Sequence, residues 1–176
     1  MRAVAQNEFG DADVLALRQL PDPSIGPDQI LVRVRAAGVN PIDHMIRAGH
    51  LRDAYPHHFP LIPGWDVAGV VEAVGPAVEG FEVGDEVFGY QRKDHVQYGT
   101  YAERIAATRR GLAHKPASIS FEEAGGLSLT GLTALQALRR VGVGEGDTVL
   151  VHAAAGGVGH LAVQIARVLG ASRVIG

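Results

Sequence analysis

The sequence predicts a β domain followed by the first part of a parallel α/β domain. In the first two-thirds of the chain, short apolar or alternating runs are separated by turn sequences such as PDPSIGPD, VGPAVEGF and VGDE, a pattern typical of β domains. After about residue 117 helical segments appear, and a strand–helix–strand succession follows, which requires a parallel sheet. We predict a first domain over residues 1–122 and a second over 123–176, both incomplete.

The first domain is expected to contain six strands and one short helix. The strands are Met1–Ala5, Val14–Leu20, Ile30–Ala37, Val67–Val74, Glu86–Phe88 and Tyr101–Ala107. In the third of these, apolar and polar residues alternate with period two, so Arg33 and Arg35 should share the solvent face. The short helix begins at Pro41, because proline is well tolerated as the first residue of a helix.

The second domain is expected to begin with helical sequence and to end with the strand–helix–strand unit. Ser118–Val141 is predicted to be helical, with Ser120 as its cap, and a second helix is expected to begin near Thr130. A turn over residues 142–147 comes next. The remaining predicted elements are a strand at Thr148–His152, a helix at Gly157–Leu169 and a strand at Arg173–Ile175.

Composition excludes several classes of function. The net charge is −3 and the basic residues are scattered, so neither nucleic acid nor an anionic membrane is expected as a partner. There is no cysteine, which excludes disulfides, thiolate zinc sites and a cysteine nucleophile. No G-x-S-x-G elbow is present for serine chemistry. The chain has neither a signal peptide nor an apolar run of about 20 residues, so we predict a cytoplasmic protein.

A glycine-rich turn lies between the predicted strand at 148–152 and the helix that follows it. Residues 154–159 read AAGGVG, the dinucleotide fingerprint G-x-G-x-x-G with alanine at its first position. Gly156 would let the backbone approach a pyrophosphate, and Gly159 would let the helix pack against the strand. The helix N-terminus then offers N–H groups to the phosphates. The predicted cofactor-binding residues of the turn are Ala155, Gly156, Gly157, Val158 and Gly159. A tight turn without a ligand is the alternative.

Six ordered motifs carry a resemblance to a known family. They are Ala37–Asp43, Pro63–Val71, Val83–Gly89, Gly99–Glu103, Leu129–Ala134 and the glycine turn. With them the chain resembles the zinc-free, ζ-crystallin-like quinone oxidoreductases of the medium-chain dehydrogenase/reductase superfamily. The resemblance implies a GroES-like β domain followed by a Rossmann domain. It also implies hydride transfer from NADP(H) to a small-molecule substrate, a quinone or an activated alkene or carbonyl, by a homo-oligomer, commonly a dimer. Because family chains are longer, we interpret this one as an N-terminal portion.

No metal site is expected. The zinc alcohol dehydrogenases of the superfamily carry cysteine ligands in segments matched here by Gly38–Asp43 and Gly89–Gly99, and a His-Glu pair where this chain has Trp65-Asp66. We interpret Trp65-Asp66 as structural. The adjacent His57-His58 diverge in any regular element, and His152 and His160, which flank the glycine turn, are interpreted as packing residues.

Three further residues are predicted to contribute to the site. In the resemblance, Asn40 lies beside the nicotinamide and its ribose, and an amide both donates and accepts hydrogen bonds there. Asp43 is expected to face the same cleft, so Asn40 and Asp43 are the predicted catalytic residues. Thr130 is expected to contact the cofactor. The alternatives are a helix cap for Asn40, a plain helix-start acid for Asp43 and a bond to the preceding helical turn for Thr130.

One departure from the family concerns the substrate. Relatives often carry a tyrosine two residues after the acid, where this chain has Met45, and a thioether delivers no proton. His44 or Tyr55 is a candidate replacement. The nearest alternative function is an enoyl reductase acting on α,β-unsaturated thioesters, and another is a non-catalytic nucleotide-binding module. A third alternative is that the chain alone is inactive. An incomplete sheet leaves strand edges unpaired, and unpaired edges favour self-association.

Overall fold

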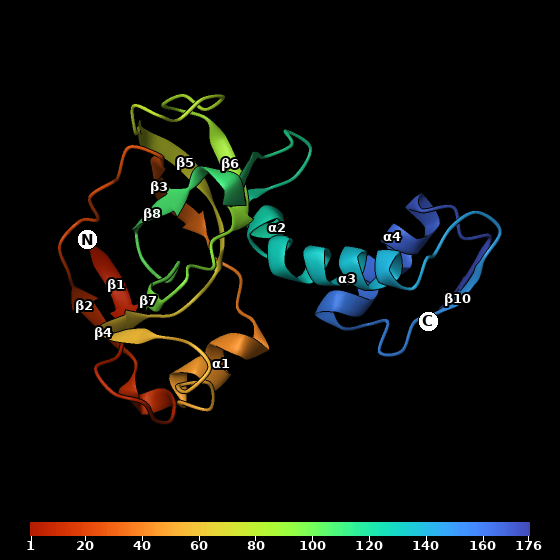
Figure 1. Ribbon diagram of the computed structural model, residues 1–176, viewed down its shortest axis with the longest axis horizontal. Coiled ribbons are helices and arrows are strands. Elements are labelled where there is room, and N and C mark those ends of the chain that lie inside the picture. Colours follow the sequence, from red (N-terminus) through yellow and green to blue (C-terminus); the bar gives the residue numbers. More distant parts are fainter. The chain divides into compact units, whose positions relative to one another are not determined.

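The computed structural model describes all 176 residues and divides the chain into two compact units, Met1–Gly126 and Leu127–Gly176 (Figure 1). The domain boundary predicted between residues 122 and 123 lies inside helix α2 (Phe121–Gly125). That boundary stays a prediction. The fold class is confirmed, because a β-rich first unit is followed by a parallel strand–helix–strand unit.

The first unit is built on an antiparallel sheet of five strands. In sheet order they are β8 (Arg104–Thr108), β3 (Gln29–Ala36), β5 (Asp66–Val74), β6 (Glu86–Tyr90) and β9 (Leu112–His114). Ile30 and Val32 are fully buried and pack with apolar residues of β5, β6 and β8. On the opposite face Arg33 pairs with Glu72 at 3.0 Å, while Arg35 lies over the ring of Phe121. The alternation predicted for β3 is therefore confirmed.

Two smaller sheets complete the first unit. Strands β1 (Arg2–Ala5) and β2 (Ala16–Gln19) pair antiparallel, whereas β4 (His57–Ile62) and β7 (Val96–Tyr98) pair parallel. The sequence analysis missed β4, β7 and β9. Strand β4 contains Pro60, which argues against a strand in a sequence pattern, and the other two have three residues each, too few to show a period. Short 3₁₀ turns lie at Ala12–Val14 and Arg109–Gly111.

Four helices were expected from sequence signals, and their observed bounds differ in detail. Helix α1 covers Pro41–Arg47 and begins at the predicted proline. The helical sequence expected over Ser118–Val141, with a second helix near Thr130, is two helices, α2 and α3 (Ser128–Arg140), which separate at Gly126–Leu127. Ser120 caps α2 as predicted, since its Oγ accepts from the N–H of Glu123 at 3.1 Å and the Glu123 carboxylate accepts from the N–H of Ser120 at 2.8 Å.

The second unit contains a parallel strand pair with a helix between its strands. Strand β10 (Thr148–Leu150) pairs in parallel with β11 (Arg173–Ile175), with Val149 opposite Val174. Helix α4 (Gly157–Val168) connects them and packs on α3 through small and apolar residues. These core residues are Ala134, Leu138, Ala162 and Ala166. None of the helices has both the length and the apolar composition needed to cross a bilayer.

Candidate functional site

Between β10 and α4 the chain changes direction at Ala153, a residue to which the sequence analysis gave no role. Ala153 has a φ of 54°, in the left-handed region that non-glycine residues rarely adopt. Its carbonyl accepts a hydrogen bond from the N–H of Gly156 at 2.9 Å. This left-handed residue lies one position before Ala154, the first position of the fingerprint.

Two glycines of the turn have different surroundings. A Cβ at Gly159 would overlap the carbonyl oxygen of Ala153 and lie 2.7 Å from the Cα of Ala154, so only glycine lets the helix approach the turn this closely. A Cβ at Gly156 would make one tight contact, 3.3 Å from the Ala153 carbonyl oxygen, which a shift of a few tenths of an ångström would relieve. Gly159 is thus required by packing, whereas Gly156 is under a much weaker steric constraint.

The N-terminus of α4 is open to an acceptor. Gly156 occupies the N-cap position and provides no side-chain cap, and no acidic residue lies in the first turn. The first N–H groups of a helix have no partner within the helix and carry its positive dipole end. The turn therefore fits the pyrophosphate of a dinucleotide, and the N–H groups of Gly157 and Val158 would hold it. His160 belongs to the turn itself, because its Nδ1 lies 2.9 Å from the Gly156 carbonyl oxygen.

Thr130 lies next to this turn. A Cβ added to Gly157 would lie 3.5 Å from the Cγ2 methyl of Thr130, so α3 brings the threonine to the start of α4. Its hydroxyl is 3.4 Å from the carbonyl oxygen of Leu127, which is the bond to the preceding helical turn that we weighed as the alternative. The structure thus brings Thr130 and the glycine turn together, and contact with a cofactor stays a prediction.

The other predicted site residues lie in the first unit, in a buried polar cluster made of Asn40, Asp43, Asp66 and Tyr101. The side-chain amide of Asn40 donates to Asp66 Oδ2 at 2.9 Å. Asp43 Oδ2 accepts two hydrogen bonds, from the backbone N–H of Asn40 at 2.8 Å and from the hydroxyl of Tyr101 at 2.9 Å. Asn40 and Asp43 also form a capping box at the start of α1. Asn40 is therefore a helix cap, whatever else it does.

Burial controls the protonation of this polar cluster. The pKa of Asp43 is raised because burial disfavours the carboxylate, and hydrogen bonds from Asn40 and Tyr101 only partly oppose this effect. The pKa of Tyr101 is raised by burial first and then by the neighbouring Asp43 carboxylate. Both groups therefore favour their neutral forms more than they would in water. Asp66 is fully buried and receives the Asn40 amide, which agrees with the structural role predicted for it.

Glycines allow three separated motifs to meet at the polar cluster. Gly64, in the Pro63–Val71 motif, has a φ of 93°, and a Cβ there would lie 2.5 Å from the Tyr101 ring. A Cβ at Gly38 would lie 2.9 Å from Asp66 Oδ2. The segments around residues 40, 65 and 100 therefore approach one another closely only because these positions lack side chains.

Tyr101 is the member of the polar cluster to which the sequence analysis gave no role. Of the two replacements suggested for the missing tyrosine, His44 approaches the Pro41 carbonyl at 3.3 Å and Tyr55 packs edge-on against Trp65. Tyr101 is the tyrosine whose hydroxyl binds Asp43. The sequence signal that could have identified Tyr101 was its place in the Gly99–Glu103 motif. Its contact with Asp43 could not be predicted, because 58 residues separate the two in the chain.

No group of three or more histidine, aspartate or glutamate side chains lies close enough together to hold a metal ion. His58 and His95 have ring centroids 5.7 Å apart, and His57 packs edge-on against Phe9. These histidines are in aromatic contacts. Zinc independence stays a prediction.

Comparison with known proteins identifies the family. Residues 26–117 match the alcohol dehydrogenase GroES-like domain. The chain belongs to this family. Human quinone oxidoreductase is 40% identical over 173 residues, which are 97% of this chain and 50% of the human protein. The NADPH-dependent alkenal/one oxidoreductase of Arabidopsis thaliana, a chloroplastic protein, is 41% identical over 180 residues, 99% of this chain and 46% of the relative.

A solved structure agrees with these relatives. An alcohol dehydrogenase superfamily protein from Novosphingobium aromaticivorans superposes with a TM-score of 0.89 at 43% identity, covering 99% of this chain and 52% of that protein. The resemblance to the quinone oxidoreductase branch of the medium-chain dehydrogenase/reductase superfamily is therefore confirmed. The chain spans about half the length of the curated relatives that it matches.

Proposed function

We propose that this chain is part of an NADPH-dependent, zinc-independent oxidoreductase that transfers a hydride to a quinone or to an activated alkene or carbonyl compound. The glycine turn carries the proposal, because it combines an uncapped helix N-terminus with a backbone left open at Gly156. The names of two relatives, an NADPH-dependent alkenal/one oxidoreductase and a quinone oxidoreductase, support the choice of cofactor and substrate.

The proposed cofactor site is formed by backbone rather than by charged side chains. The N–H groups of Gly157 and Val158 would bind the pyrophosphate, Gly156 would let the backbone approach it, and Ala155 and Gly159 would shape the turn around it. The Thr130 hydroxyl would turn from the Leu127 carbonyl, 3.4 Å away, to donate to the cofactor from α3. When bound, NADPH supplies the hydride.

Asn40 and Asp43 would act at the substrate end. The Asn40 amide is held by Asp66 and its backbone by Asp43, so it would present a fixed hydrogen-bonding group to the nicotinamide or its ribose. Such preorganisation lowers the barrier by orienting the reactants. Because no thiolate or metal-ligating cluster is present, hydrogen-bond donors would have to polarise a substrate carbonyl. We also propose that the complete protein acts in the cytoplasm as a homo-oligomer, commonly a dimer, with a domain boundary near residue 122.

The first experiment is a titration of NADPH and NADH into the 176-residue chain, followed by nicotinamide fluorescence. Saturable binding that prefers NADPH is the expected result, and Gly156→Ala should weaken it about tenfold. Absence of saturation with either nucleotide would contradict the proposal that this turn is a cofactor site.

Substrate class is tested next, with NADPH oxidation as the signal. A benzoquinone, a medium-chain 2-alkenal and an enoyl thioester are each supplied in excess to the chain. Oxidation with the quinone or the alkenal supports the proposal, and oxidation with the thioester alone supports an enoyl reductase. Nucleotide binding without oxidation of any of the three supports a non-catalytic nucleotide-binding module.

A further inference from the structure

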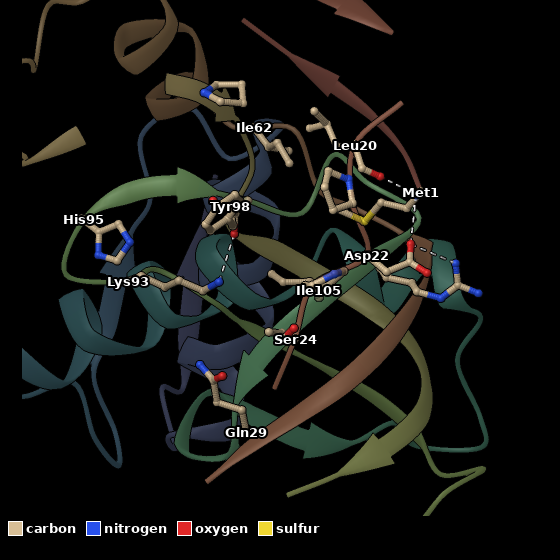
Figure 2. A pocket seen from close by; sticks show the side chains of 16 residues that line it. Met1, Leu20, Asp22, Ser24, Gln29, Ile62, Lys93, His95, Tyr98 and Ile105 are labelled. Carbon is tan, nitrogen blue, oxygen red and sulfur yellow. Dashed lines mark hydrogen bonds and ion pairs between the residues drawn. The ribbon is translucent and has the colours of Figure 1, made fainter. Parts of the chain in front are cut away.

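The first unit contains a cavity of about 550 Å³ that is separate from the polar cluster around Asn40. Its walls are largely apolar and include Leu20, Ile62 and Ile105 together with prolines 21, 23 and 60. Cavities of this volume with apolar walls and a few polar groups are typical of sites for small molecules. Figure 2 shows the Lys93 side chain extending among the residues that line this cavity.

Lys93 reaches this cavity without a carboxylate partner. Its Nζ donates to the carbonyl oxygen of Tyr98 at 3.1 Å, and it forms none of the ion pairs of the chain. Although the side chain is only half-buried, desolvation lowers the pKa of Lys93 to about 8. The geometry and the missing counter-charge together favour the neutral amine, which is the nucleophilic form.

The only other lysine, Lys115, is held in the opposite way. Its Nζ pairs with Glu86 at 3.0 Å and donates to the carbonyl oxygens of Pro116 at 3.1 Å and Ile119 at 2.6 Å. These contacts hold the Lys115 nitrogen outside the cavity, whose lining it does not join. Since the chain also lacks cysteine, Lys93 is the one lysine amine at this cavity, in a chain without thiols.

We propose that Lys93 captures aldehydes with apolar tails as an imine in this cavity. The neutral amine attacks the carbonyl carbon, and the electrons of the C=O bond move to oxygen. Two proton transfers, from nitrogen to oxygen, then allow water to leave as the C=N bond forms. One amine and one aldehyde give one imine and one water, so the step needs no oxidant or reductant. The cavity walls would hold the tail.

The other titratable groups that line the cavity are Met1, Asp22, His95, Tyr98 and Arg104. The α-amino group of Met1 is the rival nucleophile. It is paired with Asp22 at 2.9 Å and donates to the Leu20 carbonyl at 2.7 Å, and Arg104 lies 3.7 Å from the same carboxylate. The α-amino group would have to leave both partners to attack an aldehyde, whereas Lys93 has no ion pair to break, so Lys93 should react first.

The expected reactivity follows from the fraction of neutral amine. With a pKa of about 8, Lys93 is about one-quarter neutral at pH 7.5, whereas an ordinary lysine is about 0.1% neutral. The difference is about 200-fold in the concentration of the nucleophile. Even after a loss of intrinsic nucleophilicity at lower pKa, we expect Lys93 to react at least about tenfold faster than Lys115.

The test is reductive trapping with hexanal and sodium cyanoborohydride, without any nicotinamide, so that it is independent of the proposed function. The 176-residue chain is labelled, digested at acidic residues and mapped by mass spectrometry. A hexyl group on Lys93, with a labelling rate that rises with pH around a midpoint near 8, is the expected result. Preferential labelling of Met1 or Lys115, or no labelling, would overturn the proposal.

Matched variants refine the result. Lys93→Arg should remove the modification at this site because guanidinium forms no imine under these conditions, and Lys115→Arg should leave the rate at Lys93 unchanged. Circular dichroism confirms that each variant is folded, and if Lys93→Arg unfolds, the wild-type peptide map still decides. For each aldehyde, the labelling rate at Lys93 is divided by the labelling rate of free lysine. This ratio should be several-fold lower for acetaldehyde, which has no long apolar tail, than for hexanal. The same ratio for both aldehydes would rule out a role for the cavity.

Discussion

The polar cluster of the first unit and the glycine turn of the second unit are built by opposite means. In the first unit, Asn40, Asp43, Asp66 and Tyr101 hold one another through side-chain hydrogen bonds. In the second unit, the glycine turn has no side-chain cap at the N-terminus of α4 and leaves the backbone open. Substitutions that change a functional group should therefore disrupt the polar cluster of the first unit. Substitutions that add volume should disrupt the glycine turn of the second unit.

Gly159→Ala should have the largest effect. The new methyl would overlap the Ala153 carbonyl, and because backbone cannot move aside as a flexible side chain does, we expect the free energy of unfolding to fall by about 3 kcal/mol. Urea unfolding followed by circular dichroism measures this change. Gly131→Ala on α3 is the matched control, since its Cβ would make only ordinary contacts of 3.5 Å or more. Equal stability of the two variants would contradict the close packing of the turn.

Asp43→Ala should come next. The substitution leaves the Asn40 N–H and the Tyr101 hydroxyl without their acceptor, and buried donors that lose a partner cost about 2 kcal/mol of unfolding free energy. Tyr101→Phe should cost about 1 kcal/mol by itself. In a double-mutant cycle, the second substitution should cost clearly less in the Asp43→Ala background. Strict additivity would show that the hydroxyl and the carboxylate act independently.

Gly156→Ala should separate binding from stability. Its methyl would make one tight contact, 3.3 Å from the Ala153 carbonyl oxygen, so the free energy of unfolding should fall by only about 1 kcal/mol. The methyl would nevertheless occupy the space proposed for the pyrophosphate, and NADPH should bind about tenfold more weakly, which corresponds to about 1.4 kcal/mol. Fluorescence titration measures the affinity. Unchanged affinity would remove Gly156 from the proposed cofactor site.

Asp43→Asn should have the smallest effect, visible as a dependence on pH. Because the pKa of Asp43 is raised in the folded protein, the folded state holds this proton more tightly than the unfolded state. The contribution of Asp43 is therefore most favourable below its unfolded pKa of about 3.9 and declines as the pH rises through the folded pKa. The asparagine variant lacks this decline, so its stability relative to the wild type should improve between pH 4 and pH 7. Denaturant unfolding at both pH values tests the sign, and an opposite trend would mean that hydrogen bonds outweigh burial at Asp43.

Local sequence signals predicted most of the elements. The alternation of β3, the proline at the start of α1 and the Ser120 cap each act within a few residues, and the structure confirms them. Strands β7 and β9 were missed because three residues show no period. Their pairing depends on partners elsewhere in the sheets.

By itself, the sequence determined the succession of strands and helices and the composition of the glycine turn, because hydrophobic period and backbone freedom are properties of neighbouring residues. Tertiary structure decided which polar groups meet. Asp43 and Tyr101 are 58 residues apart, and the two lysines look alike in the sequence although one is paired with a carboxylate and the other lines an apolar cavity. Hydrogen bonding and desolvation depend on distances through space, and these exist only once the chain has folded.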